Sequence, residues 1–304
     1  MGIDGFIAAI VSSVELDPNA VSTARPTLLI LAASMIDAAS SSERALRRIN
    51  SGAPRAGSPL SRLFNEATLQ DARKHVVDAT LVAEYALLSA CDHARAFATL
   101  LRVSRRPATS VVTLTRAALE SLARARWLAR DEDLNALVHR TLSLLYGDLR
   151  YPAYFGEQML TRNGLPLDPA AQRALYRSEL ARLGLQEPAK VEISKLVADL
   201  IDADIKHQDG PRLYSILSSV AHAHRAGINA FVQIEPGTDH FAMEAPLPTI
   251  TEFVLQVAVT LLSTTEAVLS WYGAVPAELD RVHGAMARVA ARLDLLPEEA
   301  FAES

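Results

Sequence analysis

The stretch Tyr214-Ser-Ile-Leu-Ser-Ser-Val-Ala-His-Ala-His-Arg225 has the periodicity of a helix that meets two different environments. At helical spacing, one side collects the polar residues Tyr214, Ser218, His222, Arg225 and Asn229. The opposite side is mostly apolar and collects Leu213, Ile216, Val220, His224, Gly227, Ile228 and Phe231. We predict one helix over 211–233 and place His224 in the core. Because a buried polar stripe costs free energy without partners, we expect neighbouring helices to face it with charged or hydrogen-bonding groups.

The rest of the chain is also predicted to be helical. Half of the 304 residues are hydrophobic but only 6% are aromatic, and much of that half is Ala and Leu, which favours an all-α protein. Prolines stand just inside the starts of several apolar-periodic segments, and Asp168-Pro169 has the pattern of an N-cap followed by the first helical residue. The expected helices are 2–14, 26–50, 70–104, 108–130, 132–150, 168–184, 188–206, 211–233, 248–272 and 276–294.

These helices are expected to form a single-domain bundle over 1–304. The Gly-, Pro- and Ser-rich segment 51–59 is a linker too near the N-terminus to divide two domains, so residues 1–57 should pack on a 58–304 core. Residues 234–248 contain the turn signal Pro236-Gly237 and predict a short hairpin or flap. That segment is either a mobile lid or an ordinary surface connection.

Charge and cysteine content narrow the class of protein. A net charge of -5 and a pI of about 5.9 argue against nucleic acid as a partner, although a local basic groove is compatible with them. Cys91 is the single cysteine, so one chain builds neither a disulfide framework nor a cysteine-based zinc site. We find no glycine-rich phosphate loop, no signal peptide and no apolar stretch of about 20 residues. We expect a cytoplasmic protein with no membrane, no metal and no cofactor.

Two segments place ionisable residues on helices that should be packed. Asp92 and His93 lie on the expected helix 70–104, where offsets from Leu81, Tyr85 and Leu88 put Asp92 on the core-facing stripe. A partly desolvated Asp92 would have a raised pKa and act as an acid or base; alternatively it pairs with an arginine and ties helices together.

The helix expected over 108–130 carries a second polar stripe. Arg116, Glu120 and Trp127 share one side of it. If the pair is buried, Glu120 orients Arg116 toward a carboxylate or carbonyl; otherwise the charges decorate the surface.

On the opening segment, His222 is the candidate general acid or base because its unperturbed pKa is near neutrality. Ser218 offers a binding hydroxyl, and Tyr214 and Arg225 would polarise a carbonyl. The aromatic cluster within 145–155, which includes Tyr146, either lines the mouth of an apolar pocket or fills a helix kink.

At Tyr214-x-x-x-Ser218-x-x-x-His222, with Asp92-His93 and Arg116-x-x-x-Glu120, the chain resembles all-helical proteins of high-GC bacteria over residues 75–270. These are remotely similar to HEPN bundles, many of which are ribonucleases. The HEPN nuclease pattern of an Arg followed after four to six residues by a His is absent here, which argues against RNA cleavage. Some proteins of this kind look like polyketide tailoring cyclases.

The resemblance and the residues together favour a cofactor-independent acid–base enzyme that dehydrates, cyclises or performs conjugate addition on a hydrophobic small molecule such as a polyketide. His222 and Asp92 would move protons while His93 and Glu120 assist. Arg116, Trp127, Tyr146, Tyr214, Ser218 and Arg225 would bind the substrate. The alternative is a non-catalytic HEPN-like protein that binds a ligand or partner in defence or regulation. A homodimer through the apolar helix 248–272 is a further expectation.

Overall fold

The structure is a computed structural model that describes residues 20–49, 53–104, 107–130, 133–161, 164–204, 209–234, 241–297 and 300–301. Within these ranges the chain forms twelve helices and two short antiparallel hairpins, which confirms the all-α prediction. The helix expected over 2–14 lies outside the described residues.

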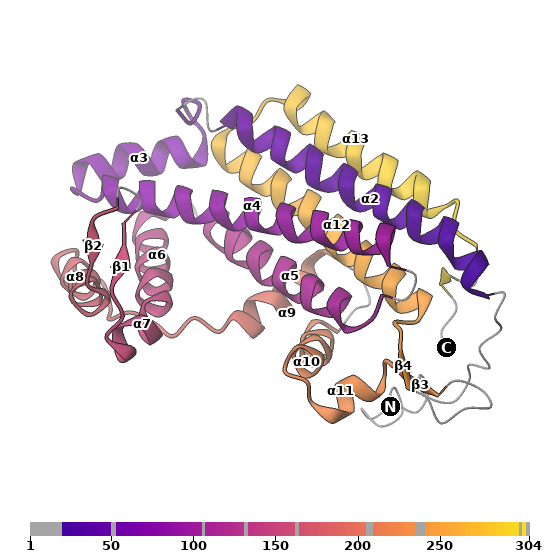
Figure 1. Cartoon of the computed structure of the whole chain (residues 1–304). Helices are drawn as coiled ribbons and strands as arrows, with labels where there is room; N and C mark the ends of the chain where they lie inside the picture. The colour runs from indigo at the N-terminus through magenta and orange to yellow at the C-terminus, as the bar shows by residue number, and fades with distance from the viewer. Residues whose placement is uncertain are drawn as a thin grey trace.

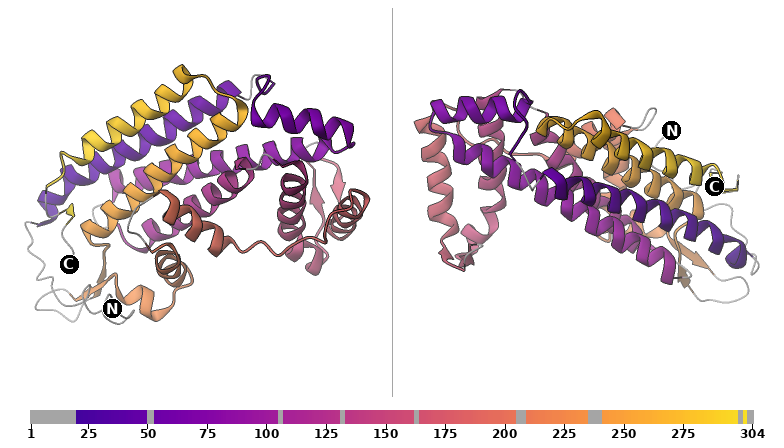
Figure 2. Two further views of the ribbon diagram at one scale, coloured as in Figure 1. Left: turned by 180° about the vertical axis from the view of Figure 1, so that it is seen from behind. Right: turned by 90° about the horizontal axis from the view of Figure 1, so that it is seen from above.

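Five long helices form the central bundle and lie lengthwise beside one another (Figures 1 and 2). They are α2 (Ala20–Ile49), α4 (Arg73–Val103), α5 (Thr109–Ala129), α12 (Leu247–Tyr272) and α13 (Pro276–Leu293). α4 packs against α2 and α5, and α12 packs against the same two helices. Leu31, Phe97, Leu119 and Phe253 are fully or almost fully buried where these helices meet. Burial of such side chains contributes roughly 1.5–3 kcal/mol each.

The apolar helix α12 belongs to this core. By length and composition it is the one helix in the described part of the chain that would also pass as a membrane span, yet 67% of its most apolar window is buried inside the protein. We had expected its apolar surface to serve a homodimer. In the structure α2, α4, α5 and α13 pack against α12 and cover most of that surface.

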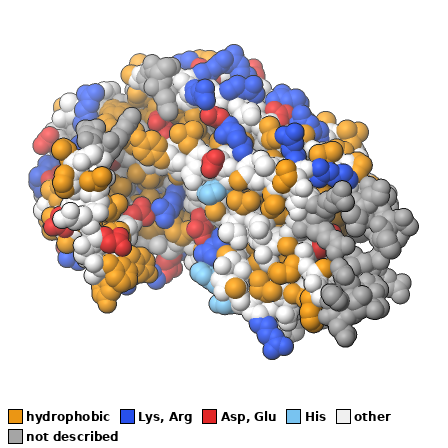
Figure 3. Space-filling view, in the orientation of Figure 1, with side chains coloured by type: hydrophobic (Ala, Val, Ile, Leu, Met, Phe, Trp, Pro, Cys, Tyr) orange, Lys and Arg blue, Asp and Glu red, His pale blue; other side chains and the backbone are white. Residues whose placement is uncertain are grey.

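Shorter elements occupy the two ends of the bundle (Figure 1). One end holds α3 (Pro59–Leu69), α6 (Leu134–Asp148), α7 (Arg150–Phe155), α8 (Pro169–Arg182) and the hairpin of β1 (Met159–Leu160) with β2 (Pro166–Leu167). The other holds α10 (Gly210–Ala221), α11 (Arg225–Asn229) and the hairpin of β3 (Val232–Ile234) with β4 (Phe241–Met243). Between them α9 (Ile193–Asp204) packs on α5. The face in Figure 3 is hollowed between the two ends.

Several local predictions are confirmed. Asp168 caps α8 by accepting hydrogen bonds from the backbone N–H groups of Ala170 and Ala171 at 2.8 and 3.2 Å, and Pro169 begins the helix. A hairpin forms near 234–248 as expected, but its first strand, β3, begins at Val232, inside the range predicted as helix, and its tip lies outside the described residues. We had not predicted α3, although Ser58 and Pro59 repeat the cap-and-proline signature that begins α8. Nor had we predicted α7 or the β1–β2 hairpin.

The single helix predicted over 211–233 is wrong. α10 ends at Ala221, and Ala223 adopts a left-handed conformation with φ of +53°. Its N–H donates to the carbonyl of Val220, and the N–H of His224 donates to that of Ser219, both at 2.9 Å. These two bonds form a Schellman motif, in which glycine is the usual left-handed residue. Because alanine stands there instead, the sequence carries no stop signal at this point.

The close approach of α11 to α10 stabilises this break. A Cβ atom added to Gly227 would lie 2.8 Å from the backbone nitrogen of Val220, so only glycine lets the two helices meet this closely. After the break the polar stripe no longer continues: Arg225 and Asn229 lie on α11, which runs in a new direction (Figure 1). His224 was expected in the core and is exposed instead.

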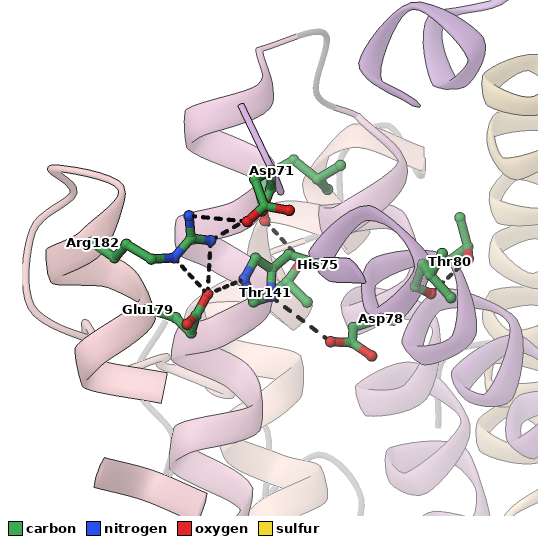
Figure 4. Close-up of polar contacts among 9 residues, drawn as sticks. Asp71, His75, Asp78, Thr80, Thr141, Glu179 and Arg182 are labelled. Carbon is green, nitrogen blue, oxygen red and sulfur yellow. Dashed lines mark hydrogen bonds and ion pairs between the residues drawn. The ribbon is translucent and has the colours of Figure 1, made fainter. Parts of the chain in front are cut away.

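A buried histidine fastens α8 to the start of α4 (Figure 4). Nε2 of His75 lies 3.1 Å from Oε2 of Glu179, and the His75 side chain is only 3% exposed. Arg182 donates to the same Glu179 oxygen at 2.9 Å and to the backbone carbonyl of Asp71 at 3.0 Å. The hydrogen bond from Arg182, assisted by His75, lowers the pKa of Glu179 despite burial. The 104-residue separation between His75 and Glu179 hides this contact from sequence patterns.

Candidate functional site

Four of the predicted site residues meet between α5 and α10, and we call them the Arg116 cluster: Arg116, Glu120, Tyr214 and His222. Nε of Arg116 donates to Oε1 of Glu120 at 2.7 Å, one turn along α5. Its two terminal nitrogens reach α10, one lying 3.2 Å from Nε2 of His222 and the other donating to the Tyr214 hydroxyl at 3.3 Å. The Tyr214 hydroxyl in turn donates to the same Glu120 oxygen at 2.8 Å.

The guanidinium of Arg116 is therefore held in one orientation. It lies 5.5 Å from the centre of the Tyr214 ring, so it also has a cation–π contact. The Arg116 and Glu120 side chains are 19% and 30% exposed, which leaves the pair half-buried rather than freely solvated. The expectation that a second helix faces the polar stripe of α10 with charged groups is confirmed for this part of the stripe.

Burial and pairing fix the protonation of two members of the cluster. Burial acts to lower the pKa of Arg116, but the hydrogen bond and charge of Glu120 more than offset it, and the net shift is upward. Burial, with the hydrogen bond to Glu120, raises the pKa of Tyr214. Both groups keep their protons at neutral pH and act as donors. His222 is exposed at the C-cap of α10.

α5 and α10, which carry the cluster, both lie beside the hollow of the molecule (Figures 1 and 3). One turn further along α5, Arg124 donates to both carboxylate oxygens of Asp148 at the end of α6, at 3.2 and 3.3 Å. Figure 3 shows basic, acidic and histidine side chains along this hollow.

The expectation that Asp92 faces the core is wrong. Its side chain is exposed, because α4 buries the stripe of Leu87, Cys91, Ala94 and Ala98. Tyr85, which we used to define the core stripe, is itself 52% exposed. Asp92 therefore lies on the outer side of α4.

His93 is half-buried and belongs to a different contact. Its Nε2 lies 3.4 Å from the hydroxyl of Ser89, and Ser121 of α5 donates to the same hydroxyl at 3.5 Å. His93 has no recorded contact with the Arg116 cluster in the described part of the chain.

The other predicted binding residues are dispersed. Ser218 lies between Tyr214 and His222 on α10, half-buried, while Arg225 is exposed at the start of α11. Trp127 packs beneath Arg140 of α6, whose guanidinium lies 5.3 Å from the centre of one of its rings. Tyr146 lines a separate cavity of about 560 Å³ between α7 and α8.

That cavity holds residues that sequence reasoning missed. Arg150 comes from α7, and Arg173 and Arg177 come from α8. The sequence pattern indicates the aromatic residues of 145–155 but not the arginines that face them. The signal available was Arg150 between the aromatics, together with two arginines four residues apart on the next helix.

Within the ranges that the structure describes, no three His, Cys, Asp or Glu side chains come together as metal ligands would. Comparison of the chain with protein-family models, curated proteins and solved structures finds no match. Function is therefore inferred from the geometry of this chain itself.

Proposed function

We propose that the Arg116 cluster is an acid–base catalytic site for a hydrophobic, oxygenated small molecule such as a polyketide. The observation that supports this most is that one guanidinium contacts a carboxylate, a phenol and an imidazole at once. Preorganised donors of this kind stabilise negative charge that develops on an oxygen, which is often the largest single contribution to catalysis.

In this proposal each residue of the cluster has one task. Glu120 fixes Arg116 and Tyr214 in place. A substrate carbonyl oxygen takes the position beside Arg116 that Nε2 of His222 occupies in the free protein, and the terminal nitrogen of Arg116 that His222 has left donates to it. His222, released from Arg116, accepts a proton from the carbon next to the carbonyl.

For a β-hydroxy carbonyl compound this gives a balanced elimination. The electrons of the broken C–H bond form the double bond, the C–O bond breaks, and the imidazolium returns its proton to the departing hydroxyl. The products are an α,β-unsaturated carbonyl compound and water. Asp92 is left out of this proposal because its carboxylate is exposed on the outer side of α4.

A panel of β-hydroxyacyl thioesters of increasing chain length, followed by mass spectrometry for loss of water, tests the proposal. We expect His222→Ala to lower the rate by about 10²–10⁴-fold, as for a lost acid–base group. His224→Ala is the matched control. His224 is also exposed and its ring centre lies 6.0 Å from that of His222, but it has no contact with Arg116 among the described residues, so the rate should stay unchanged. Equal rates for wild type and His222→Ala on every substrate turned over would refute the assignment.

The second candidate function is non-catalytic binding of a ligand or partner. It is favoured by the way Arg116, Glu120 and Tyr214 satisfy one another, as in a structural network. Binding of panel members without turnover, weakened in Arg116→Gln, would support this second function.

A further inference from the structure

We propose that the cavity between α7 and α8 binds a ligand that combines a flat aromatic ring with a phosphate, of the size of a nucleoside monophosphate. The cavity holds about 560 Å³, within the range of about 300–1,000 Å³ that small-molecule sites occupy. Its polar and aromatic lining is Tyr146, Arg150, Tyr151, Tyr154, Phe155, Arg173 and Arg177. No member of the Arg116 cluster lines it, so this site is separate from the proposed catalytic one.

The charge of the lining selects an anion. Three arginines and no carboxylate line the cavity, in a chain whose net charge is -5. Arg177 has an acidic partner, Glu187 at 3.2 Å, but these side chains are 58% and 76% exposed. A pair this exposed contributes little and leaves Arg177 available to a phosphate. Guanidinium groups bind phosphate through paired, charge-assisted hydrogen bonds.

The rings and guanidinium planes select a flat aromatic group. Arg173 lies 4.0 Å from the centre of the Tyr146 ring, and Arg177 lies 5.2 Å from the same centre. Nε of Arg173 is buried and has no hydrogen-bond partner among the described residues. Tyr154 lines the cavity and is 80% exposed, and its ring meets the Phe155 ring edge to face with 5.1 Å between centroids. Bases stack on exposed aromatic rings and on arginine planes in this way.

The wall that carries two of these arginines is fixed in place. Arg173 and Arg177 lie one turn apart on α8, and the next turn carries Glu179, which is bound to the buried His75 of α4 (Figure 4). A wall held by a buried contact keeps its arginines in position before the ligand arrives. Such preorganisation reduces the ordering cost of binding.

Isothermal titration calorimetry with AMP on the full chain tests the proposal. We expect saturable binding with Kd below about 1 mM, and at least tenfold weaker binding of adenosine, which lacks the anion, and of inorganic phosphate, which lacks the ring. The double variant Arg150→Ala/Arg177→Ala should weaken AMP binding at least tenfold. Arg130→Ala, which removes an exposed arginine outside the cavity, should leave it unchanged.

A short oligoadenylate distinguishes the source of the nucleotide. If the oligoadenylate binds at least about tenfold more tightly than AMP, the natural ligand is single-stranded nucleic acid. If both bind with equal affinity per site, the natural ligand is a free nucleotide. In either case the double variant should weaken the binding of both ligands. Both results support the proposal. It is overturned if AMP does not bind, if adenosine binds as well as AMP, or if the double variant binds like wild type. Attachment to anionic phosphatidylglycerol vesicles without AMP binding would likewise overturn it and assign the exposed aromatics to a lipid surface.

Discussion

Nε2 of His222 lies 3.2 Å from a terminal nitrogen of Arg116, although the two residues are 106 positions apart in the chain. A guanidinium has donors only, so the imidazole nitrogen has to accept this hydrogen bond. The hydrogen bond therefore requires the His222 tautomer that carries its proton on Nδ1. Once a substrate displaces His222 from Arg116, the Nε2 lone pair is free, which is what a base requires.

The tautomer of His222 is the first prediction. In ¹⁵N–¹H NMR spectra of the imidazole rings at neutral pH, we expect Nε2 of His222 to be unprotonated in wild type. Arg116→Gln should change this pattern, because the guanidinium that selects the tautomer is gone. His224 serves as the internal control and should be indifferent to that substitution. A proton on Nε2 of His222 in wild type contradicts the geometry.

The pairing of Arg116 with Glu120 predicts a measurable coupling energy. A double-mutant cycle of Arg116→Gln and Glu120→Gln, measured by denaturant unfolding, should give about 1 kcal/mol, since the pair is half-buried and shares Tyr214. The same cycle on Arg177 and Glu187, which are far more exposed, should give about 0–0.5 kcal/mol. Equal coupling energies in the two cycles would show that the Arg116–Glu120 pair behaves like an ordinary exposed ion pair.

Acid should weaken the contact between α2 and α13 through Asp37. Hydrogen bonds from Arg288 and also Arg292 lower the pKa of Asp37 from 3.8 to about 2, against the opposing effect of burial. A folded-state pKa below the unfolded one stabilises the fold above about pH 4, and this stabilisation is lost as pH falls toward 2. Arg288 is 50% exposed, so solvent screening limits the contribution to about 1–2 kcal/mol.

Asp37→Asn is therefore expected to lower the free energy of unfolding at pH 7 by that amount. The difference between the variant and wild type should shrink between pH 4 and pH 2, which urea unfolding at several pH values measures. A difference that stays constant over this range argues against the ion pairs as its origin.

The left-handed alanine between α10 and α11 predicts a stabilising substitution. Alanine at φ of +53° is strained by about 1–2 kcal/mol, while glycine is not, although glycine has more entropy to lose on folding. Ala223→Gly should raise the free energy of unfolding by about 0.5–1 kcal/mol in urea unfolding. Ala96→Gly, at an exposed position inside α4, is the control and should lower it by about 1 kcal/mol. Destabilisation by Ala223→Gly would mean that the Schellman turn is not the native geometry.

Periodicity predicted the helices because each long helix buries one continuous stripe. The limits of α12 and α13 differ from the predicted 248–272 and 276–294 by one residue. The predicted end of α10 was wrong because the helix stops where Ala223 adopts a conformation that alanine rarely occupies. The break also depends on the close fit of Gly227 against Val220. That fit is a tertiary contact, which local sequence does not encode.

The part of the candidate site that could be predicted is the part where the polar side chains of α5 and α10 hydrogen-bond to one another. Arg116 and Tyr214 were found in this way, since both interrupt otherwise apolar helices. The prediction for Asp92 failed because its side of the helix was inferred from Leu81 and Leu88, which are only half-buried. Consecutive residues lie about 100° apart around a helix, so a small error in the position of the buried stripe moves Asp92 from the core to the outer side of α4. The arginines that face Tyr146 come from α8, and only the packing of α8 on α6 and α7 brings them there.

Proton abstraction by His222 is tested most directly with a ketone that has an acidic α-proton but no leaving group, incubated with the protein in D₂O and followed by ¹H NMR. The account predicts that wild type and His224→Ala exchange the α-proton for deuterium faster than buffer alone, and that His222→Ala and Arg116→Gln do not. Exchange at the same rate in all four proteins would contradict it.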